Sequence, residues 1–62
     1  MNETESVVMS IVDHGVYKII HMKNGLVLRM NTPHSVSVGK RMHCVFQYDG
    51  THAVIKSVLS IV

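Results

Sequence analysis

The chain has 62 residues, a formal net charge of +2 with neutral histidines, and a single cysteine. A chain this short forms one domain that buries only about 60% of its unfolded surface, and a lone cysteine excludes an internal disulfide. We expect a flexible N-terminus at residues 1–5 and a single domain at residues 6–62. No apolar run approaches the roughly 20 residues that cross a bilayer. Residues 1–5 are polar, unlike a secretory signal, so we expect a cytoplasmic protein.

Apolar and polar residues alternate along much of the chain, which is the pattern of strands with one buried face. The clearest example is residues 41–48, where Met42, Cys44, Phe46 and Tyr48 fall on one side. No segment shows the spacing of an amphipathic helix. The predicted strands, in chain order, are residues 6–12, 16–22, 26–31, 35–38, 41–48 and 52–62.

The first two predicted strands depart from simple alternation. Residues 6–12 are rich in apolar side chains on both sides, which predicts a strand covered on both faces. Residues 16–22 have mixed parity, so we expect a β-bulge near Ile19 and Ile20 that places both isoleucines inside.

Two glycine-containing turns set the hairpins. Asn24-Gly25 favours a type I′ turn between the second and third strands, and Asp49-Gly50 favours a tight turn between the last two. The final segment is long for one strand, so we expect a bend near Lys56. Beyond residues 41–48, parity assigns these side chains to the core: Leu26, Leu28, Met30, Val36, Val38, Ala53, Ile55, Leu59 and Ile61.

This order of strands and turns resembles small OB-like and SH3-like barrel domains. The resemblance rests on short motifs: residues 8–13, 17–20, 23–28, 36–42 and 45–50. It implies an all-β fold, a five- or six-stranded antiparallel barrel. Barrels of this kind often bind oligonucleotides, and others bind proteins.

A second resemblance is local. Residues 27–40 are similar to the "Asn-Ala-Pro-x-x-Val-x-Val-x-Arg" segment of the carbon storage regulator family of RNA-binding proteins. The position that matches Lys40 is a basic residue that contacts RNA in that family. The family continues into a helix, whereas residues 41–48 here have the alternation of a strand.

The sequence gives little support for catalysis or metal binding. Two of the four acidic residues lie near the N-terminus and two in turns, so no carboxylate pair or Ser-His-acid set can be assigned. The histidines are dispersed, without the spacing of helical zinc ligands. We therefore expect a non-enzymatic protein with no cofactor and no metal. The five histidines are His14, His21, His34, His43 and His52.

The basic residues are the best binding signal. From His14 onward the only acid is Asp49, against six lysines and arginines. Basic side chains on a barrel face can follow a phosphate backbone while rings stack on bases. The plain alternative is a solvated outer face that keeps a β-rich protein in solution. The predicted nucleic-acid contacts are Arg29, Lys40, Arg41, His43 and Lys56 for phosphate and Tyr17 for stacking.

A second function class remains open. Five methionines and the apolar stretch at residues 58–62 suit adaptable contacts with another protein. The chain is then a protein interaction module, such as a phage- or plasmid-type inhibitor or an assembly subunit. Its apolar edge and C-terminal strand would form the interface, which also allows a homo-oligomer.

Overall fold

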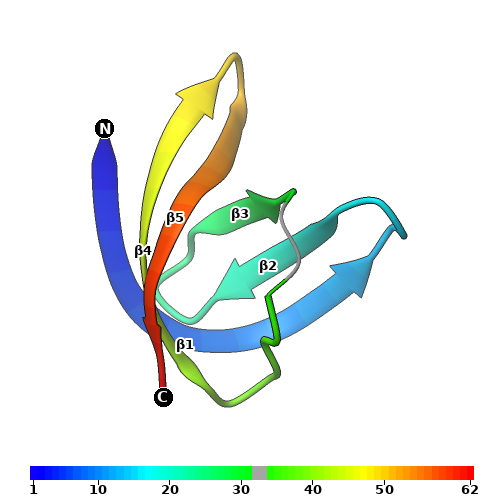
Figure 1. Ribbon diagram of the computed structural model, residues 1–62, viewed down its shortest axis with the longest axis vertical. Helices are drawn as coiled ribbons and strands as arrows, with labels where there is room; N and C mark the ends of the chain where they lie inside the picture. Colours follow the sequence, from blue (N-terminus) through cyan, green and yellow to red (C-terminus); the bar gives the residue numbers. More distant parts are fainter. Residues whose placement is uncertain (32–33) are drawn as a thin grey trace.

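The computed structural model describes residues 1–31 and 34–62, and it is all-β, as predicted. Its elements form a small closed barrel (Figure 1). The described residues contain no helix long and apolar enough to cross a membrane. The five strands are β1 (Asn2–Asp13), β2 (Lys18–Met22), β3 (Val27–Met30), β4 (Arg41–Asp49) and β5 (His52–Ile61).

The strands follow the order β1-β2-β3-β5-β4, and β4 returns to pair with β1. All neighbours are antiparallel except β3 and β5, which run parallel and pair through Leu28 with Ala53 and Arg29 with Val54. The predicted antiparallel barrel is thus confirmed with one parallel pair. The architecture is consistent with the OB-like and SH3-like barrels that the sequence resembles.

Strand β1 serves both halves of the barrel. Its residues from Asn2 to Val7 pair with β4, and those from Val8 onward pair with β2. The register shifts between Val8 and Ser10, so Met9 bulges outward where the strand changes partner. The strand begins at Asn2 rather than at Ser6, because the β4 ladder extends to the start of the chain.

The predicted bulge at Ile19 and Ile20 is wrong. Both residues pair in regular register with β1, and only Ile20 is fully buried while Ile19 is half-buried. The irregularity lies at Met9 instead, because β1 must bend where it passes from one sheet partner to the next. Met9 and Val12 are exposed, so β1 is not covered on both faces.

The β2–β3 turn differs from the predicted type I′ hairpin. That turn requires positive φ at both central residues, and in the described chain only glycines have positive φ, with Gly25 at 94°. The Gly25 N–H donates to the Met22 carbonyl and the Met22 N–H to the Leu26 carbonyl, at 3.0 and 2.8 Å. The result is a three-residue loop that ends on Gly25.

The same loop is fastened to β1. The Lys23 N–H donates to the Val7 carbonyl at 2.8 Å, and the Asn24 N–H donates to the Ser6 hydroxyl at 3.1 Å. The Asn24 side-chain amide also donates to the Thr4 hydroxyl at 2.8 Å. Among the described residues Ser6 is the buried polar one, and the bond from the Asn24 N–H satisfies its hydroxyl oxygen.

The β4–β5 hairpin confirms the tight turn at Asp49-Gly50. Asp49 pairs with His52, and Gly50 has φ of 65°, as the first position of a type II′ turn requires. The register of β5 against β4 then shifts twice, and Lys56 and Leu59 are left without partners. The first shift is the expected bend near Lys56. The second leaves Leu59 52% exposed, so its predicted core position is wrong.

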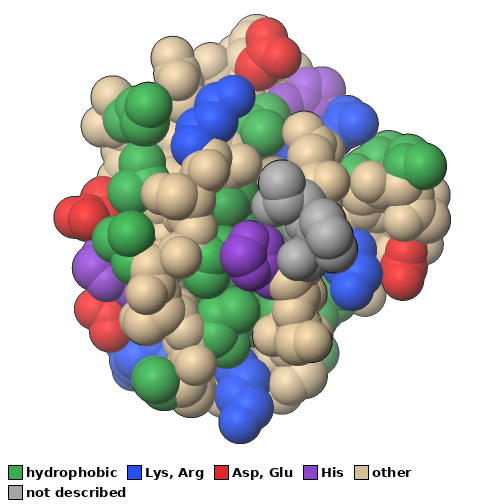
Figure 2. Space-filling model, in the orientation of Figure 1, with side chains coloured by type: hydrophobic (Ala, Val, Ile, Leu, Met, Phe, Trp, Pro, Cys, Tyr) green, Lys and Arg blue, Asp and Glu red, His purple; other side chains and the backbone are tan. Residues whose placement is uncertain are grey.

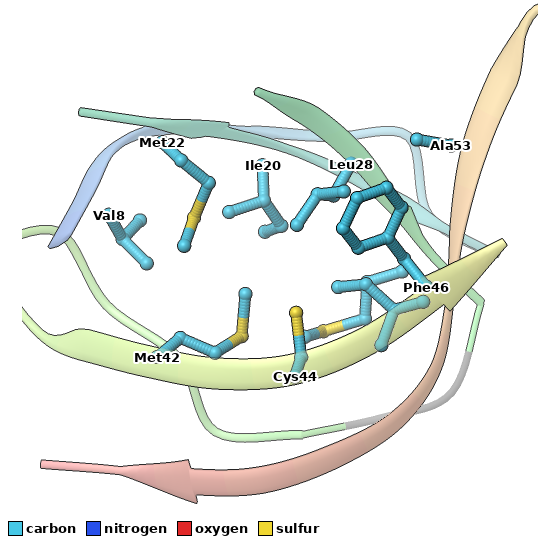
Figure 3. Close-up of a cluster of buried hydrophobic side chains, with 10 residues drawn as sticks. Val8, Ile20, Met22, Leu28, Met42, Cys44, Phe46 and Ala53 are labelled. Carbon is cyan, nitrogen blue, oxygen red and sulfur yellow. The ribbon is translucent and has the colours of Figure 1, made fainter. Parts of the chain in front are cut away.

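The core fills the interior of the barrel, where the labelled side chains point toward one another (Figure 3). Cys44 is fully buried, and burial raises the pKa of its thiol. Tyr48 and Val38 are exposed rather than buried as predicted, because β4 runs past the end of the core and residues 35–38 form no strand. The buried apolar cluster comprises Val8, Ile20, Met22, Leu28, Met30, Met42, Cys44, Phe46, Ala53 and Ile55.

Candidate nucleic-acid interface

Tyr17 and Arg29 form a stacked pair on the outside of the barrel. The Arg29 guanidinium carbon lies 3.9 Å from the centroid of the Tyr17 ring. The His14 ring stacks on the same tyrosine, with centroids 4.8 Å apart and planes at 19°. The Arg29 Nε also donates to the Asn31 side-chain oxygen at 2.8 Å. Three flat groups are therefore ordered together.

Local sequence explains why these groups meet. Arg29 alternates with buried Leu28 and Met30 on β3, so its side chain leaves the core. Tyr17 immediately precedes β2, whose register places Ile19 opposite Arg29. The loop before Tyr17 is closed by the His14 N–H donating to the Tyr17 carbonyl at 2.9 Å.

Two hollows meet beside Arg29. One, of about 270 Å³, is lined by Arg29, Asn31, Asp49, His52, Val54 and Lys56. The other, of about 120 Å³, lies toward Ile19 and Val27 and also has Arg29 and His52 in its wall. Because β3 and β5 are neighbours through Arg29 and Val54, the hollows follow the seam between these strands. We call the surface formed by Tyr17, Arg29, Asn31, His52 and Lys56 the Arg29 surface.

The Arg29 surface has a modest positive balance. Arg29 and Lys56 face one acid, Asp49, at its edge. Within the described part of the chain, the single contact of salt-bridge length joins the His43 ring and the Glu3 carboxylate, so no lysine or arginine there has a carboxylate partner. The cations of this surface are therefore available to an anionic ligand.

The structure divides the predicted contact residues among three places. Tyr17, Arg29 and Lys56 belong to the Arg29 surface. Lys40 lies in a separate groove that Tyr17 also lines. Arg41 and His43 lie on β4 beside β1, where His43 Nε2 is 3.3 Å from the Glu3 carboxylate.

The basic side chains do not form one block. On the side of the molecule in Figure 2, lysine and arginine side chains stand at separate positions. A ligand that meets several of them must extend across the surface.

Two members of the Arg29 surface were missed by the sequence reasoning. Asn31 follows Arg29 by two residues, and side chains two residues apart in an extended chain project to the same side. His52 precedes buried Ala53, which places it on the outer face at the start of β5. Parity could have found both, but the parallel β3–β5 pairing that brings them together has no local signal.

Comparisons with protein-family models, curated proteins and solved structures give no significant match to this chain. The similarity of residues 27–40 to the carbon storage regulator family therefore stays a resemblance. Residues 32 and 33 of that segment lie outside the described residues.

Proposed function

We propose that the protein is a non-enzymatic module that binds single-stranded nucleic acid across the Arg29 surface. The observation that carries the proposal is the Arg29–Tyr17 stack beside two adjoining hollows. Bases stack on aromatic rings and on arginine planes. In OB-type barrels, the face of the second and third strands and the loops after the first and fourth strands bind oligonucleotides.

The residues have complementary roles in this proposal. His14 and Arg29 stack on the Tyr17 ring, and the planes that these two side chains turn away from the tyrosine can stack on bases. Lys56, on the other side of the seam, offers a charge for the phosphate backbone. Asn31 holds the guanidinium of Arg29 in place through its 2.8 Å bond and so reduces the entropy lost on binding.

The test is a fluorescence anisotropy titration with a labelled single-stranded oligonucleotide of about 16 nucleotides, the upper site size of one OB barrel. Arg29→Gln and Lys56→Gln are compared with Arg41→Gln, which removes the same charge on β4 beside β1. We expect the first two variants to weaken binding and to lower the slope of log K against log salt by about 0.7 each.

Equal losses in Arg41→Gln and Arg29→Gln would show a nonspecific charge effect and overturn the proposal. An unchanged affinity in Arg29→Gln would overturn it as well. Circular dichroism and thermal melts of each variant separate a binding defect from a loss of fold.

A protein partner is the second candidate function. The observation that favours it is the end of β5, where Leu59 is 52% and Val62 74% exposed although both are apolar. In the described chain, β5 pairs with β3 only at Ala53 and Val54, so the edge beyond Ile55 carries no strand partner on that side. Such an edge can accept a strand from another chain.

Native mass spectrometry of the wild type and Leu59→Lys tests this candidate. A homo-oligomer or a stable complex that Leu59→Lys dissociates, together with no affinity for oligonucleotides, would favour the protein partner over the nucleic acid. A monomer in both proteins would remove the support for self-association.

A further inference from the structure

A groove of about 700 Å³ lies at one end of the barrel, apart from the two hollows of the Arg29 surface. The loop before β2 and the segment that leads into β4 form its sides. Its volume is within the range of about 300–1,000 Å³ that is usual for small-molecule sites. We call it the end groove, and it is lined by Gly15, Tyr17, Lys18, Met30, His34, Ser35, Val36, Ser37 and Lys40.

The floor of the end groove is apolar. Met30 belongs to the core and is 2% exposed, and half-buried Val36 packs against the same core. The half-buried ring of Tyr17 adds an aromatic wall. A flexible thioether beside an aromatic ring suits a flat apolar group such as a nucleobase.

The rim of the end groove is polar and cationic. Lys18 and Lys40 supply two ammonium groups, and the hydroxyls of Ser35 and Ser37 can donate hydrogen bonds. None of the lining residues that the structure describes is acidic. Asp13, which pairs with Lys18 across β1 and β2, accepts the Gly15 N–H at 2.8 Å and forms no ion pair with a lysine.

An apolar floor beside a cationic rim suits a ligand that joins a flat ring to an anionic group. We propose that the end groove binds one nucleotide, with its base on the Met30 and Val36 floor and its phosphate between Lys18 and Lys40. This deepens the proposed function and rests on it in one respect, because Tyr17 belongs to both surfaces and would pass a strand from one to the other.

Two sources can provide this chemistry, a free nucleoside monophosphate or one nucleotide of a bound strand. The first experiment titrates ¹⁵N-labelled protein with adenosine monophosphate and uridine monophosphate, and separately with adenosine and with inorganic phosphate. We expect a monophosphate to shift the amide signals of Lys18, Met30 and Val36. We expect it to bind at least about tenfold more tightly than adenosine or phosphate alone.

The variants isolate the groove. Lys18→Gln combined with Lys40→Gln should weaken monophosphate binding about tenfold or more, because charged hydrogen bonds are lost. Lys23→Gln combined with Arg41→Gln is the matched control, since both residues are exposed and neither lines the groove.

The same proteins are then titrated with the oligonucleotide. A loss of affinity in the Lys18 and Lys40 double variant shows that the groove holds a nucleotide of the strand. An oligonucleotide affinity that is unchanged, with monophosphate binding lost, shows a site for the free nucleotide. Either result supports the groove.

Monophosphate binding that is equal in the wild type and the double variant would overturn the assignment, as would binding no tighter than that of phosphate alone. These outcomes differ from failure of the proposed function. The proposed function fails if Arg29→Gln leaves the oligonucleotide affinity intact, whether or not the groove binds a monophosphate.

Discussion

The Arg29 guanidinium carbon is 3.9 Å from the centroid of the Tyr17 ring, although Arg29 lies on β3, Tyr17 lies in the loop before β2, and neither faces the core. A cation placed over an aromatic ring is attracted by its electron-rich face. The contact orders both side chains before any ligand arrives, so the pair contributes to stability as well as to the candidate site.

A double-mutant cycle measures this pair. Tyr17→Leu, Arg29→Met and the combined variant should give a coupling energy of about 0.5–1 kcal/mol in urea unfolding, the range of partly exposed cation–π contacts. Additive single effects would show that the contact contributes nothing in solution.

The hydrogen bond from the Asn24 N–H to the Ser6 hydroxyl should contribute more to stability than an exposed serine hydroxyl does. Ser6→Ala leaves the Asn24 N–H without its acceptor at a partly buried position, so we expect a loss of about 1–3 kcal/mol. Exposed Ser10 on the same strand is the control, and Ser10→Ala should change the unfolding free energy by less than about 0.5 kcal/mol. Similar losses in the two variants would contradict the role of the bond.

Two of the apolar side chains that parity placed on the core side of β5, Ile55 and Leu59, should behave differently. Ile55 is 6% exposed and Leu59 is 52% exposed. Ile55→Val should cost about 0.5–1.5 kcal/mol because it removes a methylene from the packed core. Leu59→Ala should change stability by no more than about 0.5 kcal/mol. A larger loss in Leu59→Ala, measured by thermal unfolding of the monomer, would mean that Leu59 is covered in solution.

Stability should fall at alkaline pH through Cys44. Burial raises the pKa of its thiol above the ordinary 9.0, so the folded state keeps the proton at a pH where the unfolded chain loses it. The contribution is complete below pH 9.0 and declines as pH rises through that value toward the folded pKa.

Urea unfolding of the wild type and Cys44→Ala, from about pH 8 to about pH 10, isolates this effect, because the two proteins differ only at residue 44. As pH rises, the unfolding free energy of the wild type should fall relative to that of Cys44→Ala. A gap independent of pH would show that the thiol is accessible in the folded state. Slow reaction with a thiol reagent before denaturation gives a second check.

The fold class was predictable because alternation and turn residues are local signals. Met42, Cys44 and Phe46 are all buried, and the Asp49-Gly50 turn joins the two strands as expected. The positions of the β-bulges were harder to predict from the sequence. The register shifts at Met9 and Leu59 arise where a strand changes partner or bends around the barrel. Neither residue is of a type that marks a bulge in the sequence.

The candidate site was predictable only in part. Outward parity identified Arg29, and charge identified Lys56 and Lys40. Their distribution depends on the parallel pairing of β3 with β5 and on the path of residues 34–40, which are long-range features. The sequence therefore indicated which side chains leave the core, but it could not indicate which of them are neighbours.

The parallel seam between β3 and β5 has consequences for how the barrel opens. It consists of two residue pairs, whereas β4 and β5 remain paired from Met42 to Asp49. Transient opening should therefore separate the β2–β3 hairpin from β5 first and expose to hydrogen exchange the β5 amide at this seam that points toward β3. Arg29 and Lys56 stand on opposite sides of this seam. A polyanion that binds both side chains would hold β3 and β5 together. The bound protein should therefore show slower amide hydrogen exchange at this seam than the free protein.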